Sequence, residues 1–370
     1  MFKCRALDHA INVNLCGKEQ AMLLQTGGNF FFQKTCIDFS ANINFLEVPE
    51  SVMQAARSGL VAAVHEADGP EGTLNEHVAE QEGVRPEQVF CGNGASEVVR
   101  SLVQALKPKK ALLPAPGFEE YIRPLTMAEC SVTYYYTKEA DGFRIPLEDF
   151  LGQITQDTDL VFFCNPSNPA AVLYERTFIE AVLKQCEVVG AVLVVDESLL
   201  DFVELAGQMT MKSGHMSRFL FIVKEFTKMF AMSGIRLGYG LCGDGALAAR
   251  MEEGLLPLNK VSAVAQRAGI ACTKEREFVQ KTVCETAKER EWLLGRLSEI
   301  GIKAVGAANM IFFKSRPRLH AFSIMRGIMI RDCSSLEGLE QGYYRIAVRS
   351  RSENEKMIEM LSQWQEQPAG

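Results

Sequence analysis

The sequence predicts an α/β protein with a mainly parallel sheet between helices, followed by a smaller α+β domain. Short apolar segments alternate with segments of helical periodicity from about residue 45 to residue 250. Segments such as LVFFC (160–164) and AVLVV (191–195) are apolar at every position, as strands covered by helices on both faces should be. After about Glu252 the chain becomes more charged and more helical.

Seven strands are expected in the large domain, which we place at residues 45–252. Their ranges are 88–91, 111–113, 132–136, 160–164, 191–195, 219–223 and 239–242. Between them lie helical segments, one with an apolar face formed by Val98, Leu102 and Leu106 and another that begins near Phe178. Alternation of this kind is typical of a parallel sheet.

Residues 253–370 are expected to form the small domain, and residues 1–44 to pack beside it rather than in the large sheet. A long, charged helical segment is predicted at 260–300. Strand-like segments follow at 310–313 and 343–348, with the segment 328–331 between them, before a final helix that begins near Ser352. A chain of 370 residues is long enough for two domains that share an interface.

The composition argues against several classes of function. The formal net charge of −7 does not suit a nucleic-acid-binding surface. Residues 1–14 mix charged and apolar side chains, so we expect neither export nor a membrane partner, and place the protein in the cytoplasm. The 11 cysteines form no C-x-x-C pair and no cluster at metal-ligand spacing. We therefore expect no metal site.

Lys228 is the first candidate for chemistry, because it follows an apolar strand in the segment VKEFTKMFAMSGIRLGY (223–239). A lysine at the end of a strand, among cations, can supply the amine that Schiff-base chemistry requires. Arg236, eight residues later, can hold a phosphate through its forked donors. The alternative is an exposed loop lysine beside a surface arginine.

A candidate anion site lies in the segment GNGASE (92–97), between a predicted strand and a predicted helix. The N–H groups at a helix N-terminus can bind an anion, and glycine lets the ligand approach the backbone closely. Ser96 adds a hydroxyl group. The spacing matches neither the dinucleotide-binding motif nor the P-loop.

Two polar residues follow other apolar strands. Asp196 ends the segment AVLVVD and should point into the crevice at the carboxyl edge of the sheet. A carboxylate there can keep a pyridine nitrogen protonated, although a helix N-cap is the alternative. Asn168, in CNPSNP, can donate to a ring oxygen or can simply belong to a proline-rich turn.

The order of these motifs resembles that of pyridoxal-phosphate (PLP) enzymes of fold type I, and the resemblance covers essentially the whole chain. At closer range the chain resembles the threonine-phosphate decarboxylases of cobalamin biosynthesis and their sister histidinol-phosphate aminotransferases. The segments that carry this resemblance are DFSANIN (38–44), GNG with Glu97, PGFEEY (116–121), TK…GIRLGY (227–239) and YYRIAVRS (343–350).

The resemblance implies pyridoxal 5′-phosphate as the cofactor. Lys228 would form the Schiff base and carry protons, and Asp196 would pair with the pyridinium nitrogen. Asn168 would bond to the phenolic oxygen and Phe118 would stack on the ring. The residues implied to hold the cofactor phosphate are Gly94, Ala95, Ser96, Thr227 and Arg236.

On the substrate side, the resemblance implies Asn42 and Arg345 as binding residues, with Arg345 holding the α-carboxylate of an amino acid. Arg349, on the same strand face, would be a second anion contact, or else a surface arginine. A homodimer with shared active sites is also implied.

Some positions depart from the pattern of the resembling families. Leu199 stands where they usually have a tyrosine, and Glu225 stands where they commonly have a phosphate-binding serine. His65-Glu66 replaces a Tyr-Pro pair that reaches the cofactor of the partner subunit. The core of the cofactor site is therefore expected to be retained, with changes in its auxiliary contacts and in the substrate site.

The resemblance implies a PLP-dependent enzyme that decarboxylates an O-phospho-amino acid. An aminotransferase of the histidinol-phosphate type is the alternative, because small differences in substrate position decide which bond at Cα breaks. A PLP-binding protein without turnover is the third hypothesis, and retention of the candidate residues argues against it. A nicotinamide-dependent oxidoreductase is disfavoured, because no G-x-G-x-x-G follows the first strand.

Overall fold

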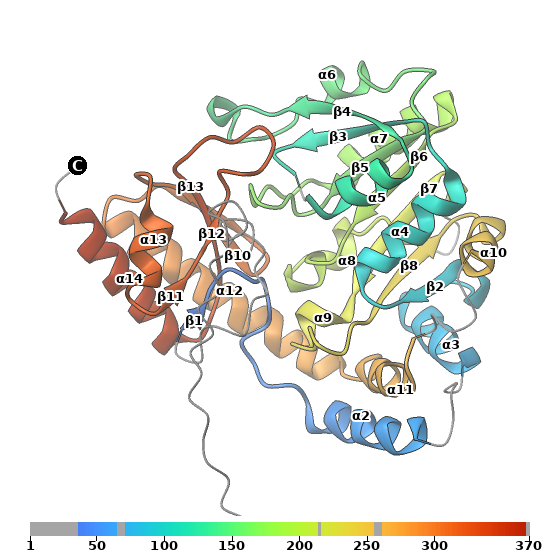
Figure 1. The fold of residues 1–370 in the computed structure, drawn as a ribbon, viewed down its shortest axis with the longest axis horizontal. Coiled ribbons are helices and arrows are strands. Elements are labelled where there is room, and N and C mark those ends of the chain that lie inside the picture. The colour runs from blue at the N-terminus through green and yellow to red at the C-terminus, as the bar shows by residue number, and fades with distance from the viewer. Residues whose placement is uncertain (1–35, 65–70, 118, 214–215, 255–260, 368–370) are drawn as a thin grey trace, which may run out of the picture.

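The structure is a computed structural model that describes residues 36–64, 71–117, 119–213, 216–254 and 261–367. Figure 1 shows the strands of the large sheet in cyan to yellow, with the smaller sheet and the helices α12, α13 and α14 beside it in orange and red. Three parts of the sequence-based predictions lie outside the described residues: Phe118, His65 and most of the N-terminal segment.

The large sheet contains seven strands in the order β2-β8-β7-β6-β5-β3-β4. Its strands are β2 Val89–Gly92, β3 Lys110–Ala115, β4 Ser131–Tyr136, β5 Leu160–Cys164, β6 Val192–Asp196, β7 Leu220–Glu225 and β8 Gly238–Cys242. β8 runs antiparallel to both of its neighbours, and the other strand pairs are parallel. The predicted seven-stranded, mainly parallel sheet is confirmed, and each strand lies within two residues of its predicted range.

Helices cover both faces of this sheet. Neighbouring residues of a strand point to opposite faces, so Phe162 and Phe163 belong to separate hydrophobic clusters. One cluster includes side chains of α4 Ala95–Leu106, α5 Ile122–Met127 and α10 Gly245–Glu253. The other includes side chains of α2 Glu50–Ala63, α3 Glu71–Glu82, α6 Leu147–Leu151, α7 Arg176–Val189 and α11 Ala263–Cys272. Two short helices, α8 Ala206–Met209 and α9 Phe226–Met229, complete this part of the chain.

The smaller sheet is antiparallel, in the order β12-β13-β10-β9. Its strands are β9 Ala304–Ala307, β10 Met310–Lys314, β12 Arg331–Asp332 and β13 Tyr343–Ala347. A separate parallel pair joins β1 Ile37–Asp38 to β11 Ile328–Met329. The remaining helices are α12 Arg276–Glu299, α13 Leu319–Ile324 and α14 Arg351–Gln365.

The segment 260–300, predicted as one long helical segment, contains two helices with different neighbours. α11 contacts α2 and α3 beside the large sheet, whereas α12 contacts α14 and β9. The reason lies in the side chains: the small apolar Ala265 and Ala268 are buried in the core of the large sheet, while Leu293 and Leu297 of α12 are buried in the core of the small one.

The parallel strands bring the carboxyl ends of β5, β6 and β7 to one edge of the large sheet. Cys164 of β5 pairs in register with Asp196 of β6, which pairs with Val223 of β7. Polar residues that follow these strands therefore meet at this edge, which is where open α/β sheets bind ligands. Within the described residues, no helix combines the length and apolar character needed to cross a membrane.

Candidate active site

Lys228 lies on α9, directly after β7. Its Nζ atom is 3.6 Å from Oε1 of Glu225, and the lysine side chain is 30% exposed. The backbone carbonyl of Lys228 accepts a hydrogen bond of 3.0 Å from the N–H of Asn44. The terminal amine is thus held at the edge of the sheet and can be reached by a ligand. The acid at position 225 faces this amine.

Asp196 is buried at the end of β6 and is only 5% exposed. Its Oδ1 accepts a hydrogen bond of 2.8 Å from the N–H of Ser198, and its Oδ2 accepts one from the hydroxyl of Tyr121. Burial raises the pKa of Asp196, and the two donors oppose that increase because they stabilise the carboxylate.

Glu225 connects Asp196 with Lys228. Its carboxylate forms the ion pair with Lys228 and also repels the charge of Asp196, which contributes to the raised pKa of Asp196. Only groups that are close together interact in this way, because charge interactions in proteins weaken with distance. Asp196 and Lys228 are therefore both close to the Glu225 carboxylate.

Arg345 joins the smaller sheet to the loop after β5. Its NH1 atom donates to Oδ1 of Asn168 and its NH2 atom to the backbone carbonyl of Ser40, each at 2.5 Å. Burial lowers the pKa of Arg345 to about 10, so the guanidinium stays charged at neutral pH. Because the amide oxygen of Asn168 faces Arg345, its NH₂ group remains the part that can donate to a ligand.

The N-terminus of α4 forms a cradle with Arg236. Gly94 has a φ of +86°, and a Cβ at this position would lie 2.5 Å from NH2 of Arg236. A Cβ on Gly238 would lie 2.6 Å from the backbone nitrogen of Ala95. Only glycine fits at either position, because the backbone and the guanidinium approach so closely. The cradle thus combines helix N–H groups with a cation, which suits a phosphate.

Thr227 and Ser96 occupy different surroundings near this cradle. Thr227 is buried, and its Oγ1 has no hydrogen-bond partner among the described residues. Ser96 is exposed and its hydroxyl donates to Oε2 of Glu120 at 2.5 Å. A buried hydroxyl without a partner is costly, so Thr227 is the better-supported contact for a ligand that is still to bind.

The two other residues expected on the substrate side are Asn42 and Arg349. Asn42 is buried; its Nδ2 donates to Sδ of Met310 at 3.5 Å, and its Oδ1 lacks a partner among the described residues. β13 ends at Ala347, so Arg349 lies beyond the strand rather than on its face. Its NH2 atom instead donates to Oε1 of Glu353 at 2.9 Å.

The structure adds two residues that the sequence did not single out. Tyr121 belonged to a recognised motif, but its contact with Asp196 depends on the short 3-10 helix η2, Glu119–Tyr121. Arg331 ended the segment 328–331 noted in the small domain, and its position becomes clear only from the register of β12 and β13, which pairs it with Arg345. Its NH2 atom donates to Oε2 of Glu119 at 3.1 Å.

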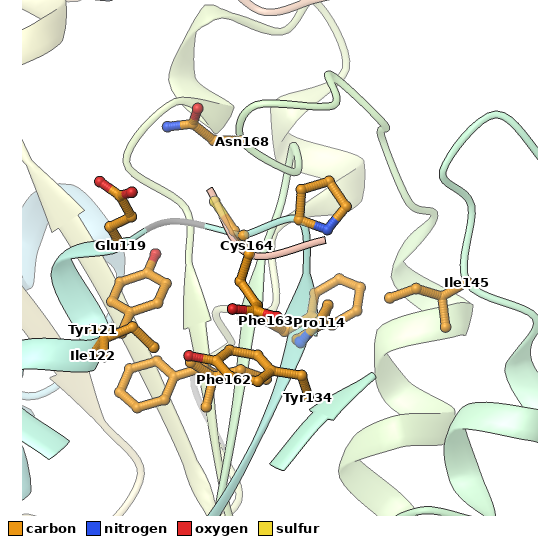
Figure 2. A pocket seen from close by; sticks show the side chains of 14 residues that line it. Pro114, Glu119, Tyr121, Ile122, Tyr134, Ile145, Phe162, Phe163, Cys164 and Asn168 are labelled. Carbon is orange, nitrogen blue, oxygen red and sulfur yellow. The ribbon is translucent and has the colours of Figure 1, made fainter. Parts of the chain in front are cut away.

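A pocket lies between η2 and the ends of β3 and β5. Figure 2 shows Glu119, Tyr121 and Ile122 on one side of it and Ile145 on the other. Tyr121 and Asn168 belong both to this pocket and to the site described above. The remaining residues in its wall are Leu113, Pro114, Pro116, Gly117, Tyr134, Phe162, Phe163, Cys164 and Glu337.

The arrangement fits PLP in four respects. It offers a reachable amine at Lys228, a buried carboxylate at Asp196, a cradle for a phosphate at the N-terminus of α4, and an unpartnered hydroxyl at Thr227. Glu225 departs from this fit, because its carboxylate forms an ion pair with the amine that has to bind the cofactor aldehyde.

Comparison with known proteins identifies the family. The family described as aminotransferase class I and II matches residues 34–361. The chain therefore belongs to the class I and II aminotransferases, which are PLP-dependent enzymes. The resemblance inferred from the sequence motifs is confirmed.

Curated relatives include both decarboxylases and aminotransferases. The chain is 30% identical over 332 residues to the threonine-phosphate decarboxylase of Salmonella typhimurium, covering 88% of this chain and 90% of that protein. It is 25% identical over 284 residues to the histidinol-phosphate aminotransferase of Methanocaldococcus jannaschii, covering 74% of each protein.

Among solved structures, the histidinol-phosphate aminotransferase of Clostridium acetobutylicum matches with a TM-score of 0.82 and 26% identity. The match covers 89% of this chain and 99% of that one.

Proposed function

We propose that this chain is a PLP-dependent decarboxylase that acts on an O-phospho-amino acid. The observation that carries the proposal is the combination of Asp196 and Lys228 around Glu225 with the arginine pair Arg345 and Arg331 on the smaller sheet. The higher identity to threonine-phosphate decarboxylases than to the histidinol-phosphate aminotransferase of M. jannaschii supports this choice of reaction.

When bound, PLP would supply an electron sink for the charge that develops at Cα of the substrate. In this proposal the amine of Lys228 would bind the cofactor aldehyde and would move protons at Cα of the substrate. Asp196 would keep a proton on the ring nitrogen, and the NH₂ group of Asn168 would donate to the ring oxygen. The phosphate contacts come from Thr227, Arg236 and the N-terminus of α4, with Gly94, Ala95 and Ser96.

The proposed substrate class follows from the two guanidinium groups. Arg345 has an Nε atom without a partner among the described residues, so it has donor capacity for the α-carboxylate. Arg331 stands opposite Arg345 in the register of β12 and β13, and the Arg331 side chain is 16% exposed. A substrate with two anionic groups, a carboxylate and a phosphate, matches this pair of cations.

Aminotransfer is the second candidate, and the similarity in fold to the C. acetobutylicum aminotransferase favours it. The same residues would serve either reaction. For decarboxylation, Arg345 would have to orient the α-carboxylate so that its bond to Cα is the one that breaks, whereas for aminotransfer Lys228 would have to remove the proton on Cα. The two outcomes therefore differ in substrate orientation rather than in the chemical groups present.

We also propose a homodimer. Leu60, Val61 and Val64, at the end of α2, are 63%, 70% and 74% exposed. Three large apolar side chains gathered on one solvent-facing helix are typical of a surface that a partner covers. A second copy of the chain fits the expectation that class I and II active sites are shared between subunits.

The reaction is tested with purified protein reconstituted with PLP. Incubation with O-phosphothreonine or O-phosphoserine should release CO₂ in the absence of a keto acid. Turnover that appears only with 2-oxoglutarate or another amino acceptor would establish the aminotransferase instead. A protein that binds PLP and turns over with none of these mixtures would support the hypothesis of binding without catalysis.

A further inference from the structure

Tyr121 makes a buried contact with the acid of the site. It is 4% exposed, and its hydroxyl donates to Oδ2 of Asp196. Its ring stacks on Phe162 of β5, with the ring centres 4.6 Å apart and the planes inclined by 13°. The ring is thus fixed by packing while the hydroxyl is directed at the carboxylate.

This contact acts on the charge state of Asp196. Burial disfavours the carboxylate and raises its pKa, and a hydrogen bond donated to the charged form opposes that effect. Burial, followed by the charge of Asp196, holds the pKa of Tyr121 well above its ordinary value. The phenol therefore remains a donor throughout the neutral range and does not become a second anion.

The hydrogen bonds also fix the carboxylate in space. The N–H of Ser198 bonds to Oδ1 and Tyr121 bonds to Oδ2, so both oxygens are held from different parts of the chain. The Ser198 donor is part of the backbone turn after β6. Tyr121 is a side chain from η2, and it can be changed without altering that turn.

We infer that Tyr121 is a positioning residue that holds the Asp196 carboxylate ionised and oriented for the nitrogen of the cofactor ring. The inference rests on the proposed function, because it concerns the same cofactor site. Tyr121 acts through Asp196, so its removal weakens cofactor binding and changes the protonation of the ring. It is not expected to remove the amine that binds the aldehyde.

The test uses Tyr121→Phe, which retains the ring on Phe162 and removes only the hydroxyl. Tyr135→Phe is the matched control, because its hydroxyl also donates to a carboxylate, that of Asp149, but from β4, which is separated from β6 by β3 and β5. Two quantities are measured: the Kd for PLP, and the ¹⁵N resonance of ring-labelled PLP bound to each protein. The second reports the protonation of the ring nitrogen, which a purely structural role of Tyr121 would not change.

Tyr121→Phe should bind PLP about 10- to 100-fold more weakly, the loss expected for a hydrogen bond to a charged group. Its ¹⁵N resonance should move from the pyridinium position toward that of neutral pyridine, because the shared proton is drawn to the more basic carboxylate. Tyr135→Phe should match the wild type in both measurements.

A Tyr121→Phe protein with wild-type affinity and a wild-type pyridinium signal would overturn the inference while leaving the proposed function in place. A wild-type protein that binds no PLP would overturn both.

Discussion

Glu225 should slow the attachment of PLP to Lys228. Oε1 of Glu225 lies 3.6 Å from Nζ of Lys228. At that separation two unit charges attract by about 4.6 kcal/mol at an effective dielectric constant of about 20, and by about 1.2 kcal/mol in water. The lysine side chain is 30% exposed and the glutamate side chain 9%, so solvent screening moves the value toward the lower end. A difference of about 1.4 kcal/mol corresponds to a factor of about ten.

The assay is the rate at which the visible absorbance band appears after PLP is mixed with the cofactor-free protein. The amine has to leave its ion pair with Glu225 before it can attack an aldehyde, so Glu225→Gln should speed the reaction about tenfold at neutral pH. The reaction with pyridoxal, which lacks the phosphate, should be faster by a similar factor, because the ion pair involves the amine and not the phosphate site. Glu148→Gln, at an exposed position on α6, serves as the control.

An unchanged or slower rate for Glu225→Gln would refute this reasoning. Acceleration with PLP but not with pyridoxal would also refute it, since the carboxylate would then be acting on the phosphate.

Three further predictions concern stability, substrate binding and assembly. Burial tends to raise the pKa of Glu82, but Lys224 and Lys212 outweigh it and hold the pKa at about 2. The resulting stabilisation, about 3 kcal/mol, should be complete above pH ~4.5 and lost as the pH falls from there to about 2. Urea unfolding should show a smaller loss of stability between pH 7 and pH 3 for Glu82→Gln than for wild type, whereas the exposed Glu80→Gln should behave like wild type. Arg345→Lys should raise KM for the amino acid about 10- to 100-fold, because lysine lacks the forked donors. Arg326→Lys, at an exposed position, should leave KM unchanged. A wild-type KM for Arg345→Lys would contradict the assignment of Arg345 to the α-carboxylate. Light scattering should give a dimer for the wild type and a monomer for the double variant Leu60→Glu/Val61→Glu. A wild-type protein that is fully active as a monomer would contradict an active site shared between subunits.

The fold was largely predictable, because the buried strands are marked in the sequence. Residues 160–164 and 192–195 are apolar throughout, and this pattern has few explanations other than strands covered on both faces. The antiparallel direction of β8 leaves no comparable mark, since a buried strand reads the same in either direction. The same limit applies to the break between α11 and α12, where the different packing partners decide the boundary.

The candidate site was predictable where it depends on the ends of strands. Asp196 is the last residue of β6 and Lys228 follows β7, and the parallel topology alone brings them to one edge. The contacts of Tyr121 and Arg331 depend on a 3-10 turn and on an edge strand of two residues, which local patterns do not specify. The direction of the Glu225 side chain, toward the amine, likewise emerges only from packing.

The central claim is that the amine of Lys228 carries PLP while Asp196 lies close enough to act on the same ring. Visible absorption spectra of the wild type, Lys228→Ala and Asp196→Asn, each mixed with PLP, test it most directly. We predict a yellow wild type, loss of the lysine-bound band in Lys228→Ala, and a band with altered position and weaker PLP binding in Asp196→Asn. A wild type that stays colourless with PLP, or a Lys228→Ala protein that keeps the wild-type band, would contradict the account.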